Sequence, residues 1–302
     1  MNYYPTPLNI STMTGLSKLN CDINLKELYD ILRITNRIKY IEVGPEHKGY
    51  SKKNDIKKRK KKLSKTFYNQ LTIIVYSEIY NKNVNVKLFN NGKIQFTGLK
   101  NKYCAEEIIK YIITIMNKQL NIYNEIYDVL NNIINKTISI ELNTDELNTD
   151  ELNTDELNTI STLNRPIIYN KNSSTLSYDP IRIVLINSDF DIKFPINREV
   201  LHKIVVDKNI FSTYEPCIYP GVNIKYYFNK ENKLKNGICS CISKCNGKGN
   251  GIGDGNCKRI TICVFQSGKA IITGAQYDVQ LIEAFIFIKK LILYNAEYIK
   301  TG

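Results

Sequence analysis

Four cysteines in the C-terminal part of the chain have a spacing that could support metal binding. They are Cys239, Cys241, Cys245 and Cys257, which form a C-x-C-x₃-C-x₁₁-C pattern in a glycine-rich segment. Four thiolates can hold a zinc ion tetrahedrally and thereby stabilise a segment that has few apolar residues. The spacing lacks paired C-x₂-C knuckles, so it is compatible with structural zinc and equally with four reduced loop cysteines. We expect no other cofactor.

A second pattern occurs twice and contains a Gly-Lys pair that resembles part of a phosphate-binding loop. The chain reads FNNGKIQFTGL at 89–99 and FQSGKAIITGA at 265–275. The nucleotide motif requires Gly-x-x-x-x-Gly-Lys-Ser/Thr between a strand and a helix. In the second copy Ala270 replaces the Ser/Thr, no glycine lies five residues upstream, and the turn joins two expected strands. ATP binding is therefore not expected there.

Residues for catalysis are also lacking in the sequence. The chain has two histidines, His47 and His202, and it has no nucleophile elbow, no paired carboxylate motif and no Cys/His dyad. We therefore expect that the protein is not an enzyme.

The charge of the chain favours an acidic partner. Its net charge is +13 with a pI of about 9.2, and nucleic acid is the first candidate for such a balance, although a solubility role would also explain it. The run KKRKKK at 57–62 fits a nuclear-localisation signal, a phosphate-contacting loop or a solvated basic stretch.

The location expected from the sequence is intracellular. The N-terminal residues MNYYPTPLNIST lack the pattern of a secretory signal, and no 18-residue apolar run predicts a membrane helix. We expect neither secretion nor a membrane partner. We expect the cysteine thiols to be reduced.

Two long blocks of the chain correspond to each other, which indicates an internal duplication. INLKELYDIL at 23–32 matches INREVLHKIV at 196–205, nearly in the register of the repeated Gly-Lys pattern. We predict a first repeat at 1–120 with an insertion at 45–66, a linker at 121–180, and a second repeat at 181–302 with an insertion at 229–258. The linker contains acidic ELNTD repeats, interpreted as solvated spacer or as a self-interaction segment.

Each repeat is expected to be α+β, with a strand hairpin around the Gly-Lys turn and a helix after it. The predicted closing helices are 104–120 and 279–293, which have apolar residues at helical spacing. Since strand side chains alternate between faces, Phe89 and Phe265 are predicted on the open face of the sheet, away from the helices. An exposed aromatic residue among lysines and threonines at the same place in both copies indicates binding.

The second repeat resembles the TATA-box-binding protein family. The resemblance rests on KFPI at 193–196, YEP at 214–216 with PG at 220–221, and F-x-S-G-K-x-x-x-T-G-A at 265–275. The first repeat resembles the family more weakly, through CDINLKEL, KTFYNQLTI and LFNNGKIQFTG. The Asn-, Lys- and Ile-rich composition is similar to members carried by large DNA viruses of protists.

The resemblance implies a saddle of two pseudo-symmetric repeats, with a curved antiparallel sheet on the DNA side and helices on the convex side. It implies binding in the minor groove of double-stranded DNA at A·T-rich sites. Aromatic wedges would be inserted between base steps and bend the duplex. The wedges carried over by resemblance are Phe67, Phe89, Tyr219 and Phe265, of which Tyr219 replaces the usual Phe.

Other DNA contacts are implied by position. The base-edge positions are Thr12, Thr14, Gln95, Thr97, Leu185, Asn187, Ile271 and Thr273. The family offers an Asn and a Val from the first strand of each repeat, so Thr12, Thr14, Leu185 and Asn187 depart from it, as does Gln95. The phosphate contacts are Lys65, Asn91, Lys93, Lys100, Lys225, Ser267 and Lys269.

The family also docks a transcription factor IIB-like protein, which brings RNA polymerase, through two acidic residues. Glu215 matches one of them and Cys217 occupies the other position. The sequence therefore predicts a transcription initiation factor. The alternatives are a repurposed saddle that acts as a non-sequence-specific DNA-binding or protein-interaction module, and an accessory domain of an enzyme, for which no catalytic domain is attached.

Overall fold

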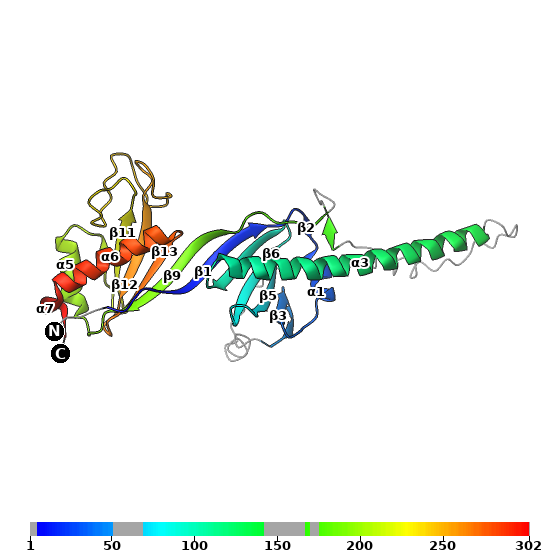
Figure 1. Cartoon of the computed structure of the whole chain (residues 1–302), viewed down its shortest axis with the longest axis horizontal. Coiled ribbons are helices and arrows are strands. Elements are labelled where there is room, and N and C mark those ends of the chain that lie inside the picture. The colour runs from blue at the N-terminus through cyan, green and yellow to red at the C-terminus, as the bar shows by residue number, and fades with distance from the viewer. Residues whose placement is uncertain (1–4, 51–68, 142–166, 170–174, 302) are drawn as a thin grey trace. The chain divides into compact units, whose positions relative to one another are not determined.

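The computed structural model describes residues 5–50, 69–141, 167–169 and 175–301 (Figure 1). Several predictions fall outside this part of the chain: the KKRKKK run, the wedge Phe67, the phosphate contact Lys65 and the ELNTD repeats beyond Glu141.

The described strands form a large antiparallel sheet. Eleven of them hydrogen-bond in the order β10-β11-β12-β13-β9-β1-β7-β6-β5-β3-β4. The pairs from β10 to β9 and from β6 to β4 are all antiparallel. Together with the helices this arrangement confirms the α+β class. The chain divides into two compact units, and each is described by itself below.

Unit 1 consists of Met1–Gly15, Thr97–Asn101 and Arg182–Gly302. Its main elements are β9 (Arg182–Asp191), α5 (Arg198–Asp207), β10 (Ser212–Thr213), β11 (Val222–Phe228), β12 (Lys258–Val264), β13 (Lys269–Ala275), α6 (Asp278–Tyr294) and α7 (Ala296–Ile299). Helix α6 packs against β11, β12 and β13, so one face of these strands is covered (Figure 1). The core includes an edge-to-face contact between Phe190 of β9 and Phe285 of α6, with ring centroids 4.9 Å apart.

Unit 2 consists of Leu16–Phe96 and Lys102–Ile181. Its elements are the end of β1 (Asn9–Lys18), β2 (Asp22–Ile23), α1 (Leu25–Ile31), β3 (Ile38–Val43), β4 (Glu46–Gly49), β5 (Gln70–Ser77), β6 (Lys82–Phe89), β7 (Lys93–Leu99), α3 (Lys102–Glu141) and β8 (Ile168–Tyr169). Helices α1 and α3 both pack against β5. The strands β2 and β8 form a separate two-stranded sheet.

The elements of the two units follow each other in the same order. The series β1-α1-β3-β5-β6-β7-α3 corresponds to β9-α5-β10-β11-β12-β13-α6. The matched Ile-Asn pairs have the same local structure. Asn24 and Asn197 are N-caps whose side chains accept hydrogen bonds from the backbone N–H three residues later, and the preceding Ile23 and Ile196 are buried.

The predicted alternation of the hairpin strands is confirmed by burial. The residues predicted to point toward the helices are fully buried: Val84, Val86, Leu88, Ile94 and Phe96 in unit 2, and Ile260, Ile262, Val264, Ala270 and Ile272 in unit 1. Their sequence neighbours are half-buried or exposed, except Cys263, which is buried. Phe89 and Phe265 therefore lie on the face opposite the helices.

Two elements differ from the expectation. Helix α3 runs to Glu141 instead of ending near residue 120, because residues 121–141 contain neither Gly nor Pro to end it (Figure 1). Strand β4 lies inside the segment predicted as a loop insertion at 45–66. It pairs with β3 through a two-residue turn at Gly44 and Pro45, where Val43 lies opposite Glu46.

Among the described residues, none of the helices combines the length and the apolar character that crossing a membrane would require.

Candidate nucleic-acid interface

The face of unit 1 that α6 leaves uncovered carries four of the eight predicted base-edge residues, namely Leu185, Asn187, Ile271 and Thr273. On β9 and β13 three cross-strand pairs follow one another: Asn187 lies opposite Thr273, Asp189 opposite Ile271, and Asp191 opposite Lys269. Ile186, Ser188 and Phe190, which alternate with these β9 residues along the strand, are buried on the opposite face of the sheet. We call this surface of β9, β11, β12 and β13 the open face of unit 1.

The Gly-Lys turn at the end of the open face has a geometry that requires glycine. Gly268 has φ +81°, and a Cβ built on it would lie 2.3 Å from the carbonyl oxygen of Phe194. Its N–H donates to the Phe265 carbonyl at 3.0 Å. Gly92 in unit 2 repeats this arrangement, with φ +74°, a Cβ 2.3 Å from the carbonyl oxygen of Cys21, and a 3.0 Å bond to the Phe89 carbonyl. The repeated pattern is thus a tight hairpin turn.

Two residues assigned to phosphate contact have a structural partner in these turns. The Ser267 hydroxyl accepts from the N–H of Lys269 at 3.5 Å, and the Asn91 side chain accepts from the N–H of Lys93 at 3.3 Å. Both side chains therefore shape the turn that presents the following lysine, and both lysines are exposed.

Two of the predicted wedges lie side by side on the open face of unit 1. The rings of Tyr219 and Phe265 have centroids 5.9 Å apart and an interplanar angle of 59°. Tyr219 comes from the turn before β11 and is 37% exposed, while Phe265 comes from the end of β12 and is half-buried. Gly221 lets them approach, since a Cβ there would lie 2.9 Å from Tyr219 and 3.1 Å from Phe265. The two predicted wedges of unit 1 therefore form one partly exposed aromatic pair.

The Tyr219 phenol and the neighbouring Cys263 thiol are both held in their neutral forms. Burial raises the pKa of the Tyr219 phenol, and a side-chain hydrogen bond with Cys263 raises it further. Burial likewise raises the pKa of the Cys263 thiol, whose sulfur lies 3.0 Å from the Asn223 side-chain oxygen. Near pH 7 the aromatic pair is therefore flanked by uncharged groups.

A hollow of about 940 Å³ adjoins the aromatic pair. Its walls include Tyr219, Phe265, Lys269, Ile271 and Thr273, together with residues of β9 and of the N-terminal segment. Of these, Ile271 is 38% exposed. Two aromatic rings, an exposed apolar side chain and a lysine around one hollow suit a ligand that has flat apolar surfaces and anionic groups.

The polar groups of β9 already have partners in the protein. Thr273 donates its hydroxyl to the side-chain oxygen of Asn187. The Asp189 carboxylate accepts from the Asn9 amide at 3.1 Å and from the Ser11 hydroxyl. A nucleic-acid base at this position must therefore compete with, or add to, an existing network.

The other predicted base-edge residues, on β1, β7 and the start of β9, are less exposed than Ile271. Thr14 is buried, with 8% of its surface exposed, and the Thr12 hydroxyl is buried with no hydrogen-bond partner among the described residues. Leu185 of β9 is half-buried, as are Thr97 and Gln95 of β7.

The predicted phosphate lysines differ in their availability. Lys269 and Lys93 are exposed at the hairpin turns. Lys225 donates to the Thr261 hydroxyl at 2.9 Å, and burial lowers its pKa. Lys100 donates to the carbonyl of Ile10 at 3.0 Å. Phe89 is half-buried in unit 2, and its expected companions Phe67 and Lys65 lie outside the described residues.

The segment predicted to dock a partner protein is exposed in unit 1. Glu215 and Cys217 are both exposed, and Ile218, the residue before Tyr219, is 85% exposed. The Glu215 carbonyl accepts from the N–H groups of Ile218 and Tyr219 at 2.9 and 2.8 Å. Glu215 thus belongs to a hydrogen-bonded turn that also contains Tyr219.

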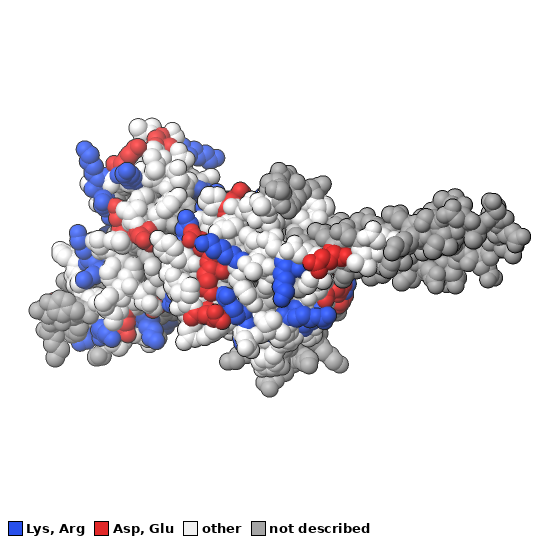
Figure 2. Space-filling model, turned by 45° about the vertical axis from the view of Figure 1, so that its right-hand side comes forward, with Lys and Arg blue, Asp and Glu red and all other residues white. Residues whose placement is uncertain are grey.

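Sequence reasoning missed the two carboxylates on the open face, Asp189 and Asp191. The alternation of β9 would have placed both there, because they are two and four residues beyond Asn187. On the face drawn in Figure 2, acidic and basic side chains interleave and the basic ones do not form one block.

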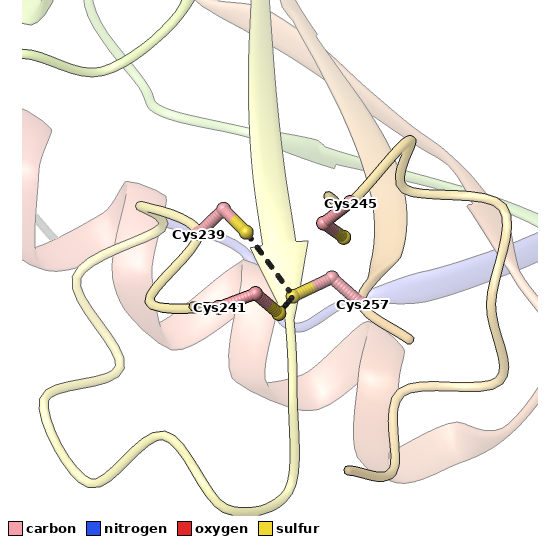
Figure 3. Close-up of side chains that lie close together, drawn as sticks. All are labelled: Cys239, Cys241, Cys245 and Cys257. Carbon is pink, nitrogen blue, oxygen red and sulfur yellow. Dashed lines mark hydrogen bonds between the residues drawn. The ribbon is translucent and has the colours of Figure 1, made fainter. Parts of the chain in front are cut away.

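The four cysteines of the insertion lie close together and could hold a metal ion. Their sulfur atoms are all within 4.8 Å of one another, although they come from positions up to 18 residues apart (Figure 3). The insertion itself lies between β11 and β12, away from the residues of the aromatic pair in sequence.

Comparisons with known proteins agree with the resemblance in the sequence. The chain is 27% identical over 240 residues to a TATA-box-binding protein-like protein of Acanthamoeba polyphaga mimivirus, an alignment that covers 78% of this chain. The chain spans about half the length of that curated relative, of which 51% is covered. No model of a known protein family matches.

Among solved structures, the Methanococcus jannaschii TBP is similar at 16% identity and a TM-score of 0.45, covering 96% of this chain and 99% of that chain. The curated match agrees with the resemblance of the sequence to this group of proteins, and the large antiparallel sheet with its helices is compatible with it.

Proposed function

We propose that the protein is a transcription initiation factor that binds the minor groove of duplex DNA through the open faces of its units and bends it. Aromatic side chains would enter base steps at the hairpin turns, which costs a few kcal/mol per step and is offset by a larger contact surface. The DNA-related role is supported by the name of the viral relative.

The observation that carries this proposal is the aromatic pair of unit 1. Tyr219 and Phe265 come together from separate segments, with ring centroids 5.9 Å apart, and they line a hollow together with Lys269. An apolar wedge needs such exposure, and a neighbouring cation can contact the phosphate of the step that the wedge opens. A Phe and a Lys recur at the turn of unit 2 as Phe89 and Lys93.

A transcription factor IIB-like protein is the partner that we propose for the exposed turn around Glu215, and RNA polymerase would be recruited through it. The charge of Glu215 suits a basic partner surface, whereas the uncharged Cys217 weakens that complementarity relative to the family pattern. The protein would act in the nucleus or in a cytoplasmic viral factory.

Selection from random DNA duplexes tests the function most directly. The full chain is mixed with a randomised duplex library, bound molecules are recovered over several rounds, and their sequences are compared with the input. We expect enrichment of A·T-rich sites, because A·T and T·A pairs present only acceptors in the minor groove. Recovery of no duplex above background would contradict DNA binding.

A second candidate function is favoured by Asp189 and Asp191. Carboxylates on the open face repel phosphates and compete for the hydroxyl and amide donors that would otherwise reach bases. A repurposed saddle that binds DNA without sequence preference, or that binds a protein, would account for them. Duplex recovery without sequence enrichment would favour this reading over the promoter-binding one.

Lys269→Ala should weaken DNA binding about equally on all sequences. The lysine is exposed at the turn beside Phe265, and a phosphate contact contributes affinity and salt dependence without base preference. The slope of log K against log salt concentration should become shallower by about one contact, as measured by fluorescence anisotropy at several salt concentrations.

Lys290→Ala is the matched control for this prediction. It removes the same charge from an exposed site on α6, on the other side of the sheet. It should leave the salt slope unchanged. If both variants changed the slope alike, Lys269 would act through the net charge and would not be a phosphate contact.

A further inference from the structure

We propose that Cys239, Cys241, Cys245 and Cys257 bind one Zn²⁺ ion, which ties the insertion at 229–257 to the ends of β11 and β12. This site is independent of the DNA-binding function proposed above. It would be a structural metal site in a segment that has no counterpart in the other unit.

The arrangement of the four sulfur atoms matches a single tetrahedral ion. Metal–sulfur bonds of about 2.3 Å give sulfur–sulfur distances of about 3.8 Å in a regular tetrahedron. Cys257 Sγ lies 3.4 Å from Cys241 Sγ and 3.6 Å from Cys239 Sγ, and all four sulfurs lie within 4.8 Å of one another. Figure 3 shows the four side chains gathered in one place, with the sulfurs of Cys239 and Cys241 next to that of Cys257. Small adjustments would complete the coordination.

The compactness of the cluster favours a single ion over an iron–sulfur cluster. A cluster keeps its cysteine sulfurs farther apart because iron and sulfide atoms lie between them. Four thiolates in tetrahedral geometry prefer Zn²⁺ among the common divalent ions, and Zn²⁺ needs no redox partner. The chemical class expected is therefore a borderline-soft divalent cation.

A buried amide supports one of the sulfur ligands. Asn229, the residue after β11, is 6% exposed and directs its Nδ2 to Cys257 Sγ at 3.7 Å and to the Gly253 carbonyl at 2.8 Å. Metal-bound thiolates commonly accept such hydrogen bonds, which orient the ligand. The same amide thus links the end of β11, the cluster and the glycine-rich part of the insertion.

The insertion has no apolar core of its own. Its buried residues are asparagines, glycines and Cys257. Of its larger apolar side chains Ile238 is half-buried, whereas Ile242 is 99% exposed, Leu234 77% and Ile252 55%. A segment of this length without buried apolar side chains needs another source of stability, and four converging thiols provide the ligands for one.

The ion would connect the insertion to the strands that lead to the open face. Cys257 directly precedes β12, whose far end leads to Phe265, and the Cys257 carbonyl accepts from Gly249 at 3.0 Å. Fixing the start of β12 would also restrain the loop that joins it to β11. The predicted consequence of metal loss is local opening of this loop with the sheet retained.

The test uses the full chain, purified under reducing conditions and loaded with Zn²⁺. Native mass spectrometry should show one zinc ion per chain, and Cys241→Ser and Cys245→Ser should each abolish it or weaken zinc binding at least tenfold. Neither residue is fully buried, so both variants should fold, as judged by circular dichroism. Cys217→Ser is the matched control, since this exposed cysteine lies outside the cluster, and it should keep full occupancy.

Two further readouts complete the test. Co²⁺ in place of Zn²⁺ should give the intense visible absorption of a tetrahedral thiolate site in the control and not in the variants. Removal of zinc by a chelator should expose the insertion to proteolysis while 182–228 and 258–301 stay protected. No zinc on the folded chain, zinc retained in both variants, or iron with sulfide in place of zinc would each overturn the proposal.

Discussion

A double variant with Phe89→Ala and Phe265→Ala is expected to lose DNA bending while keeping its fold. Phe265 packs beside Tyr219 on the open face, and Phe89 holds the equivalent turn position in unit 2. Without the rings, nothing opens the base steps, so the duplex stays straight and the contacts that depend on a bend are lost. Bending is measured by fluorescence energy transfer between dyes at the two duplex ends, and the fold by circular dichroism.

Phe211→Ala is the control for this loss. Phe211 is 58% exposed in unit 1 but lies outside the aromatic pair, so its removal takes away a similar apolar surface from another place. Bending should then be unchanged. Wild-type energy transfer in the double variant, at saturating protein, would show that these rings are not wedges.

Gly268→Ala is expected to destabilise unit 1 by about 2 kcal/mol or more. A left-handed conformation costs a non-glycine residue about 1–2 kcal/mol, and here the new Cβ would also lie 2.3 Å from the Phe194 carbonyl oxygen. The chain must shift the turn away from the segment after β9. For a unit of this size the expected fall in melting temperature is about 4–8 °C, measured by differential scanning calorimetry.

Gly253→Ala separates the two causes. Gly253 has φ +82°, close to that of Gly268, but a Cβ there would meet nothing within 4 Å. It should therefore cost only the conformational part, at most about 1–2 kcal/mol. Equal destabilisation by the two substitutions would mean that the close approach to Phe194 contributes nothing.

The local structure of the hairpins could be predicted from the sequence because it depends on neighbours in the chain. Alternating apolar residues around a Gly-containing turn predicted the strands and their buried faces, and burial confirms both. The Asn-capped helix starts at Asn24 and Asn197 were recognisable for the same reason. The wedge, base-edge and phosphate roles of individual residues stay predictions.

Longer-range features could not be predicted from local patterns. The length of α3 was readable, because residues 121–141 contain neither Gly nor Pro, but the pairing of β4 with β3 adds an edge strand to a segment that reads as a loop. The partners of Asp189 are about 180 residues away in the chain, at Asn9 and Ser11. No spacing rule within one segment reports such a contact.

The sequence by itself determined the strand and helix types, the faces of the hairpin strands and the turn glycines, since period, propensity and left-handed backbone act over a few residues. Only the tertiary structure decided that Tyr219 lies against Phe265, that Lys225 is occupied by Thr261, and that four irregularly spaced cysteines converge. These contacts depend on where separate strands and loops meet, and that follows from packing of the whole unit.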